Sequence, residues 1–290
     1  MLFPVSGVEV SPFLLIGISF VISFFASMSG LSGAFLLLPF QVSFLGFVSP
    51  AVTPTNLLYN VVSIPGGVYR YVKEARMVWP LTIAVIIGTF PGLFIGTFLR
   101  LRYFMDPVKF KIFVGLVLLY IGIRMVLNAR KTQVKRLTGE AKVRTIKFDT
   151  KEIVYTFNGK TYRASTPGIF ILSFIVGIIG GIYGIGGGAI IAPFFVAIYR
   201  LPIHTIAGST LMGTFLTSVA GVIIYQILSI FYPGAPVAPD WALGIVMGVG
   251  GIFGVYLGAR SQKYIPSKYL KIMLSIVILY VAIKYVWLLF

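Results

Sequence analysis

A glycine-rich sequence occurs twice in this chain, as GLSGAFLLLPF at residues 30–40 and as GIGGGAIIAPF at residues 184–194. Both copies lie inside long apolar segments. Glycine weakens a helix there, because it loses more conformational entropy on folding than any other residue. A helix break inside a bilayer exposes peptide groups that hydrocarbon cannot satisfy, so it is tolerated only where protein or a cavity surrounds it. The duplicated break therefore predicts a duplicated binding site, which is typical of secondary transporters.

The composition assigns the chain to the integral membrane proteins. Of its 290 residues, 58% are hydrophobic and only 11% are charged. The net charge of +17 would suggest nucleic acid for a soluble protein. In a membrane protein, basic loops set the orientation and contact anionic headgroups, so we expect the bilayer and not nucleic acid as the partner. We predict a multi-pass protein of the cytoplasmic membrane.

The hydrophobic segments divide the chain into two similar halves. They cover residues 12–48, 52–69, 77–99, 107–128, 167–199, 203–231, 241–260 and 267–290. One span needs about 20 residues. The first and fifth segments are longer and contain the glycine breaks, so we expect each to form two short helices that meet at the break.

The duplication extends beyond the glycine motif. Residues 79–99 align with 241–261, so that Gly88, Gly92 and Gly96 match Gly250, Gly254 and Gly258. Small residues four apart let helices approach closely in lipid, and we predict packing as their role. The sequence thus predicts an all-α polytopic protein with membrane repeats at residues 1–128 and 167–290.

The polar linker at residues 129–166 has a strand-like composition. Residues 143–148 and 152–157 read as strands, and Asn158-Gly159 is a hairpin turn sequence. We predict a small basic β-insert at the membrane surface. A linker is favoured as its role over a regulatory or ligand-binding domain.

The distribution of Lys and Arg favours two inverted halves. If each broken segment supplies two crossings, each half has five, and most basic loops, the insert included, fall on one side. That side would be cytoplasmic, with both termini outside. Only the loop at residues 100–111, with Arg100, Arg102, Lys109 and Lys111, then disagrees with the rule.

No acidic or basic residue is expected deep in a span. Carboxylates are the usual relays of proton-coupled carriers, so their absence favours an anion as substrate. The N–H groups at half-helix N-termini could bind it, since glycine allows close approach. Nearby Ser, Thr and Asn side chains would complete the coordination.

The candidate substrate-binding residues are Gly30, Ser32, Gly33, Asn56, Gly184, Gly186, Gly187, Gly188, Ser209 and Thr210. His204, the only histidine, is a candidate for proton coupling, although an interfacial position is favoured. No cofactor, metal site or catalytic residue is predicted, and cysteine is absent. The chain is therefore not expected to be an enzyme.

The two glycine motifs, the two halves and the polar central loop together resemble the sulfite exporter TauE/SafE family, also called the toluene sulfonate uptake permease family. The resemblance covers nearly the whole membrane part. The first motif departs from the second, with Ser32 and Ala34 in place of Gly186 and Gly188. The resemblance implies transport of a small sulfur-containing anion, such as sulfite or an organosulfonate.

Two other functions remain open at this point. The same scaffold could form an anion channel, since duplicated breaks also suit a pore. Alternatively, the chain could be a non-transporting receptor or assembly factor that works through the insert. The sequence leaves open the exact substrate, the direction of transport, the coupling ion and the oligomeric state.

Overall fold

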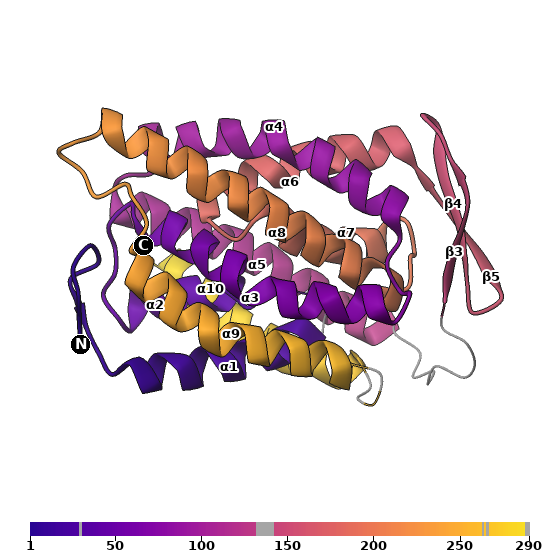
Figure 1. Cartoon of the computed structure of the whole chain (residues 1–290), viewed down its shortest axis with the longest axis horizontal. Helices are drawn as coiled ribbons and strands as arrows, with labels where there is room; N and C mark the ends of the chain where they lie inside the picture. Colours follow the sequence, from indigo (N-terminus) through magenta and orange to yellow (C-terminus); the bar gives the residue numbers. More distant parts are fainter. Residues whose placement is uncertain (29–30, 132–141, 263, 265–266, 288–290) are drawn as a thin grey trace.

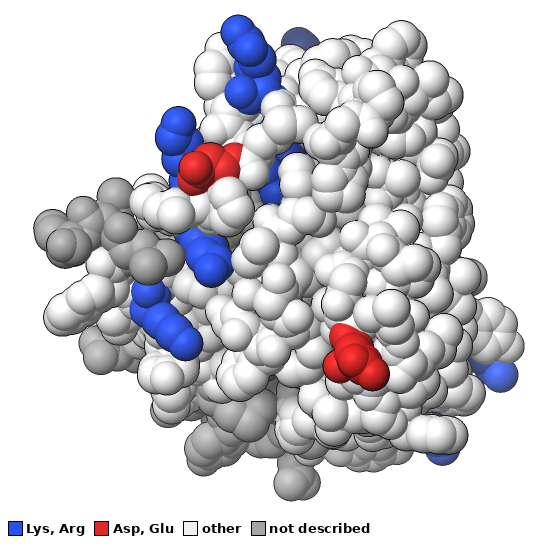
Figure 2. Space-filling view, turned by 90° about the vertical axis from the view of Figure 1, so that its left-hand side faces the viewer, with Lys and Arg blue, Asp and Glu red and all other residues white. Residues whose placement is uncertain are grey.

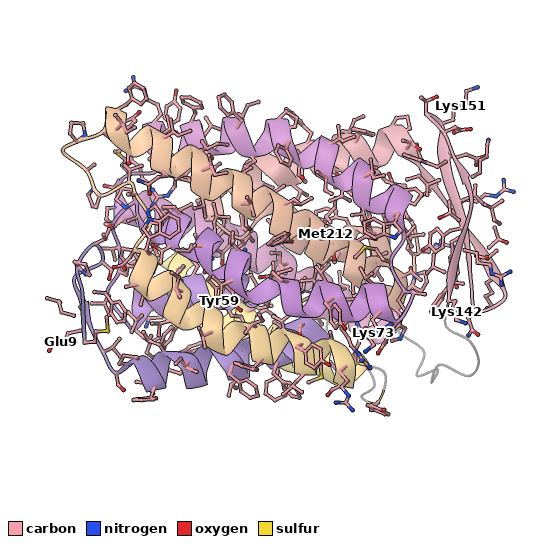
Figure 3. All side chains as sticks on the ribbon, in the orientation of Figure 1. Glu9, Tyr59, Lys73, Lys142, Lys151 and Met212 are labelled. Carbon is pink, nitrogen blue, oxygen red and sulfur yellow. The ribbon has the colours of Figure 1, made fainter. Side chains whose placement is uncertain are left out.

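The computed structural model describes residues 1–28, 31–131, 142–262, 264 and 267–287. In this part of the chain, α-helices run side by side and a small β-sheet extends from one end (Figure 1). Lys73, Lys142 and Lys151 lie at the end with the sheet, and Glu9 lies at the opposite end (Figure 3). We call these the sheet end and the terminal end.

Two short strands precede the helices, β1 (Leu2–Phe3) and β2 (Val8–Glu9). The first half contains α1 (Pro12–Met28), α2 (Ala34–Ser43), α3 (Val52–Lys73), α4 (Trp79–Tyr103) and α5 (Pro107–Lys131). The second half contains α6 (Thr166–Tyr183), α7 (Gly187–Ala197), α8 (Ile203–Leu228), the 3₁₀ turn η1 (Ser229–Phe231), α9 (Trp241–Ser261) and α10 (Ser267–Val286).

Five of the described helices are long and apolar enough to cross a membrane: Trp79–Tyr103, Pro107–Leu127, Thr166–Tyr183, His204–Phe231 and Trp241–Ser261. Helix α3 has 22 residues but is not among them. Its first half carries Thr and Asn side chains that are fully buried in the bundle, and the buried Ser63 follows them. Helix α3 therefore supplies a polar interior, while large exposed apolar side chains such as Phe13 and Ile171 suit the lipid-facing surface.

The predicted breaks are confirmed. Helix α6 ends at Gly184 and α7 begins after Gly186, with φ of 84° and 72° at these glycines, values that L side chains rarely adopt. Helices α2 and α7 have 10 and 11 residues, so each is about 15–17 Å long, half of a hydrocarbon core. The expectation that each broken segment crosses twice is therefore wrong. The Ser43 hydroxyl at the end of α2 lies 2.7 Å from the Tyr285 hydroxyl near the end of α10, so α2 returns to the terminal end.

The predicted β-insert is also confirmed. Strands β3 (Val143–Phe148), β4 (Glu152–Phe157) and β5 (Lys160–Ser165) form an antiparallel sheet in that order. Asn158 and Gly159 have φ of 49° and 71°, as a type I′ hairpin turn requires. The Tyr155 hydroxyl lies 2.8 Å from the Thr205 hydroxyl, which fastens the sheet to the start of α8.

The turn between β3 and β4 depends on the charge of one carboxylate. Asp149 accepts hydrogen bonds from the Lys147 ammonium group and from the backbone N–H groups of Lys151 and Glu152, at 2.8 Å each. These contacts, the lysine first, lower the pKa of Asp149 to about 2. A depressed carboxyl pKa stabilises the turn above pH 4, and this stability is lost as the pH falls toward 2.

We therefore expect the ¹³C carboxyl resonance of Asp149 to titrate near pH 2 in detergent-solubilised protein. The spectrum is simple because the chain has only three aspartates, Asp106, Asp149 and Asp240. Asp149→Asn assigns the resonance. A midpoint at the ordinary value near 4 would contradict the described turn.

The two glycine stripes pack helices of one half against helices of the other. A Cβ added at Gly92 or Gly96 would lie 2.2 Å from the carbonyl oxygen of Phe174 or Ile178 in α6. A Cβ at Gly250 would lie 2.1 Å from Ile16 O in α1. Since neither contact leaves room for a methyl group, the predicted packing role is confirmed.

The packing between the halves is reciprocal. Helix α4 runs parallel to α6 and packs against α8, while its counterpart α9 runs parallel to α1 and packs against α3. The remaining pairs join counterparts directly: α3 to α8 and α5 to α10. These counterparts run antiparallel, as Gly115 contacts Tyr285 whereas Gly122 contacts Leu279.

Candidate functional site

The two glycine breaks meet at α3. Asn56 and Asn60 are one helical turn apart, so both side chains lie on the same face of this helix. Both are fully buried. Asn56 Nδ2 donates hydrogen bonds to Ala34 O at 3.0 Å and to Gly184 O at 2.9 Å. One amide group therefore joins the start of α2 to the end of α6.

Asn60, one helical turn further along α3, makes a second link between the two breaks. Its Nδ2 donates to Ile185 O at 3.1 Å and contacts Ser218 Oγ of α8 at 3.2 Å. Its Oδ1 accepts a hydrogen bond from the Ser32 hydroxyl, which in turn accepts one from Ala34 N at 3.1 Å. Side chains of the bundle thus satisfy four of the peptide groups at the breaks, namely Ala34 N, Ala34 O, Gly184 O and Ile185 O.

Two further side chains hold the breaks together. The Tyr183 hydroxyl donates to Phe35 O at 2.9 Å, and Gln41 Nε2 donates to Asn56 Oδ1 at 3.1 Å. Tyr183 belongs to the second half, while Phe35 and Gln41 belong to the first. All three are buried, so a displacement of one break changes buried hydrogen bonds at the other.

The glycines at the breaks allow very close contacts with neighbouring helices. A Cβ at Gly188 would lie 2.0 Å from Thr210 O, and one at Gly184 would lie 2.6 Å from Thr53 O. A Cβ at Gly187 would meet the Thr89 methyl group at 2.6 Å. In the conformation described, α3, α4 and α8 therefore pack tightly over the second break.

Most of the candidate residues lie in this cluster: Ser32, Gly33, Asn56, Gly184, Gly186, Gly187, Gly188 and Thr210. Gly30 lies outside the described residues. Ser209 is placed differently, because its hydroxyl donates to Val78 O at the start of α4, at 3.0 Å. His204 is the second residue of α8, beside the contact of Thr205 with the insert, and about 9 Å along the helix from Thr210.

The burial of Arg100 was not predicted from the sequence. Arg100 was placed in a loop, but α4 continues to Tyr103 and buries Arg100 completely. The spacing could have indicated this, since Arg100 follows Gly88, Gly92 and Gly96 at the same interval of four and so lies on the same face. Three further residues of the site were not predicted: Ser218, which contacts Asn60, Thr89, which lies at Gly187, and Tyr59, which lies at Gly33.

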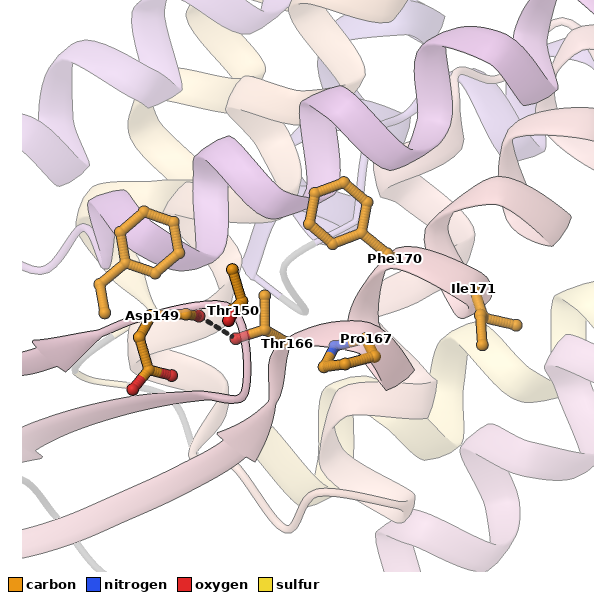
Figure 4. Close-up of a pocket in the computed structure, with 7 residues that line it drawn as sticks. Asp149, Thr150, Thr166, Pro167, Phe170 and Ile171 are labelled. Atoms are coloured by element: carbon orange, nitrogen blue, oxygen red, sulfur yellow. Dashed lines mark hydrogen bonds between the residues drawn. The ribbon is translucent and has the colours of Figure 1, made fainter.

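A separate cavity of about 550 Å³ lies where the insert meets α6 (Figure 4). It lies between the β3–β4 turn and the first turns of α6, where Thr166 Oγ1 donates to Asp149 O at 2.9 Å. Its walls include Phe148, Pro167, Phe170 and Ile171. Because these walls are mainly apolar, the cavity lacks the convergent donors that an anion needs.

Several apolar helices of membrane length, with two broken helices joined at a buried polar centre, define a polytopic membrane transporter. The sequence profile of the family "Sulfite exporter TauE/SafE" matches residues 15–285. The chain therefore belongs to the TauE/SafE family of membrane transporters, as its sequence resemblance implied, and it is not an enzyme.

Relatives similar to this chain are described as probable membrane transporter proteins. YunE of Bacillus subtilis (strain 168) is 24% identical, over 90% of this chain and 92% of the relative. MJ0441 of Methanocaldococcus jannaschii is 23% identical, over 90% of both chains. A relative from Haemophilus influenzae is 26% identical, over 90% of this chain and 92% of its own. No solved structure matches the chain.

Proposed function

We propose that this protein is a secondary transporter that moves a small sulfur-containing anion of the sulfite or organosulfonate type across the cytoplasmic membrane. The observation that carries the proposal is the double hydrogen bond of Asn56, which joins a break in each half. A centre shared by two halves can open to either side when one half rotates against the other. The sulfur chemistry of the substrate follows from the family to which the chain belongs.

The halves are proposed to be inverted repeats, comprising residues 1–128 and 167–290. Reciprocal contacts between α4 and α6 and between α1 and α9 support this arrangement, since they are what a pseudo-two-fold axis generates. The antiparallel counterpart pairs favour an axis in the membrane plane. The basic insert at residues 129–166 would then face the cytoplasm under the positive-inside rule.

The substrate site is proposed at the breaks. Serine, threonine and asparagine side chains there can each donate a hydrogen bond to an oxyanion. The N-termini of α2 and α7 add N–H groups and the positive end of the helix dipole. The N-cap residue of neither helix makes a side-chain hydrogen bond, but Ser32 accepts one from Ala34 N at the start of α2, so the first N–H groups of α7 are proposed as the better donors for a substrate.

Uptake of ³⁵S-labelled sulfite and sulfoacetate into proteoliposomes tests the proposal. We expect wild-type flux to saturate and to show counterflow, and Gly187→Leu to abolish it, because the new side chain meets Thr89 at the break. Gly17→Leu is the matched control, since a Cβ at Gly17 meets nothing within 4 Å. Both variants are compared by size-exclusion chromatography for the amount of folded protein.

Full activity of Gly187→Leu would refute a site at the breaks. Unsaturable flux without counterflow would instead indicate an anion channel on the same scaffold. Deletion of residues 143–163 tests the third function, that of a non-transporting receptor or assembly factor. A carrier should keep transport without the sheet, whereas a receptor that works through the insert should lose its function.

A further inference from the structure

Arg100 is a buried arginine at the terminal end of α4. Its side chain has no solvent exposure. Its Nε donates a hydrogen bond to Thr53 Oγ1 at 3.0 Å, and its guanidinium carbon lies 3.8 Å from the centre of the Phe110 ring. The aromatic face and the single hydrogen bond of Nε thus hold the guanidinium group in place.

The two terminal nitrogens of the guanidinium group are unsatisfied. Among the described residues, neither Nη1 nor Nη2 of Arg100 has a hydrogen-bond partner, and no ion pair there includes Arg100. A buried cation without a counter-charge is strongly unfavourable, so such a group marks a place where an anion completes the structure. Parallel N–H groups of arginine match two oxygens of a carboxylate, sulfonate or phosphate.

Arg100 lies beside the second glycine break. Its partner Thr53 is the residue whose carbonyl oxygen would lie 2.6 Å from a Cβ on Gly184. Tyr225, which interacts electrostatically with Arg100, donates its hydroxyl to Gly181 O at 3.1 Å in the turn before this break. Thr53 and Tyr225 each contact the end of α6, so one residue separates the guanidinium group from the break on either route.

The surface outside Arg100 is positively charged. Arg102 and Lys109 are exposed and Lys111 is half-buried, all in or next to the short connection between α4 and α5. Figure 2 shows the terminal end, where Lys and Arg side chains gather on one side of the face around an acidic side chain. The acid of this connection, Asp106, caps α5 by accepting from Val108 N and Lys109 N at 2.9 Å each, so its carboxylate is directed to backbone groups.

This connection is the one basic loop that disagrees with the positive-inside rule when the sheet end is cytoplasmic. Its charges therefore need an explanation other than orientation. Exposed cations beside a buried, unsatisfied arginine attract anions to this part of the surface.

We propose that Arg100 binds the transported oxyanion through Nη1 and Nη2 at the terminal end, and that Arg102, Lys109 and Lys111 form its cationic entrance. This assignment rests on the proposed function as an anion carrier. It adds a substrate-binding arginine to a site that was predicted from the sequence with neutral donors only.

The first test compares two buried arginines. Arg76 is also buried, but it pairs with Glu74 at 2.6 Å and donates to Gln262 Oε1 at 3.0 Å. In the absence of anions we expect Arg76→Met to lower Tm, because Glu74 and Gln262 each lose one of their two partners and keep only Arg70 and Tyr71. Arg100→Met should leave Tm unchanged or raise it, because it removes an unsatisfied charge and keeps most of the apolar stem.

The second readout is the Tm shift caused by sulfite, sulfate, thiosulfate and sulfoacetate, with chloride as control. Arg76→Met should keep the wild-type shift, Arg100→Met should lose it, and Arg100→Lys should keep only part of it. Loss of stability in Arg100→Met together with a retained anion shift would show that Arg100 is only structural, and would overturn the assignment.

Transport kinetics test the entrance. Lys109→Gln with Lys111→Gln should raise KM several-fold at low ionic strength with kcat unchanged, and the difference should vanish at high salt. Lys160→Gln with Arg163→Gln, which removes two exposed charges from β5, is the matched control and should not change KM. Equal effects of the two pairs would refute a specific entrance.

Failure of the assignment and failure of the proposed substrate can be told apart. If wild type responds to sulfur oxyanions and Arg100→Met responds equally, only the assignment of Arg100 fails. If the Tm of wild type does not respond to sulfur oxyanions but rises with phosphate or carboxylates in an Arg100-dependent manner, the assignment of Arg100 is supported and the sulfur-containing substrate is refuted. If no oxyanion changes the Tm of wild type, both the assignment of Arg100 and the proposed substrate are refuted.

Discussion

Replacement of Gly250 by valine is expected to remove most folded protein from the membrane. A Cβ at this position would lie 2.1 Å from Ile16 O and 2.3 Å from Ser19 Oγ in α1. The first obstacle is backbone, so α1 and α9 would have to separate along their whole length. Overpacking of this severity costs about 3 kcal/mol or more, which is a large part of the stability of one domain.

Gly17→Val is the control that isolates this packing effect. Gly17 lies in α1, the helix that packs on Gly250, but a Cβ there meets nothing within 4 Å. Both variants introduce the same β-branched residue into a helix, so the loss of helix propensity cancels in the comparison. The measurement is the yield of monodisperse protein and its Tm in detergent. Equal yields would contradict the close packing of α1 and α9.

Features that depend on neighbouring residues could be predicted from the sequence. The breaks at Gly184 and Gly186 follow from the weak helix propensity of clustered glycines, and the strand at 152–157 follows from β-branched and aromatic residues before an Asn-Gly turn. The packing role of Gly92 and Gly250 follows from their spacing, because residues four apart share a helix face.

Features that depend on distant parts of the chain could not be predicted. Ser209 and Thr210 are adjacent in the sequence, yet the Ser209 hydroxyl donates to Val78 O of another helix end, whereas the Thr210 hydroxyl donates to Ala207 O of its own helix and only its carbonyl oxygen lies at Gly188. The return of α2 to the terminal end depends on its length, which only the folded chain fixes. Arg100 was missed because a basic residue near a span end usually reaches the headgroups, whereas here Thr53 and Phe110 hold it inside.

Replacement of Asn56 is expected to abolish transport. Asn56→Leu leaves Ala34 O, Gly184 O and Gln41 Nε2 without their partner in a buried site. Each unsatisfied group costs on the order of 1–3 kcal/mol. Asn56→Asp is the sharper variant, because it keeps the shape but offers at most one O–H donor for two carbonyl acceptors. It should therefore release one break from the other while most of the packing remains.

The control for Asn56 is another buried polar side chain, one whose hydroxyl donates to carbonyl oxygens of its own helix. Thr217 in α8 donates to Gly213 O of its own helix at 2.7 Å, so Thr217→Val removes a hydroxyl without breaking a tertiary contact. We expect Thr217→Val to keep wild-type flux and Tm, and Asn56→Asp to lose flux with a clear fall in Tm. If Asn56→Asp transported at the wild-type rate, the link between the breaks would not be needed for alternating access. The halves would then be coupled through their other contacts, which are the glycine stripes between α1 and α9 and between α4 and α6, the hydrogen bonds of Asn60 and Tyr183, and the helix pairs α3–α8 and α5–α10.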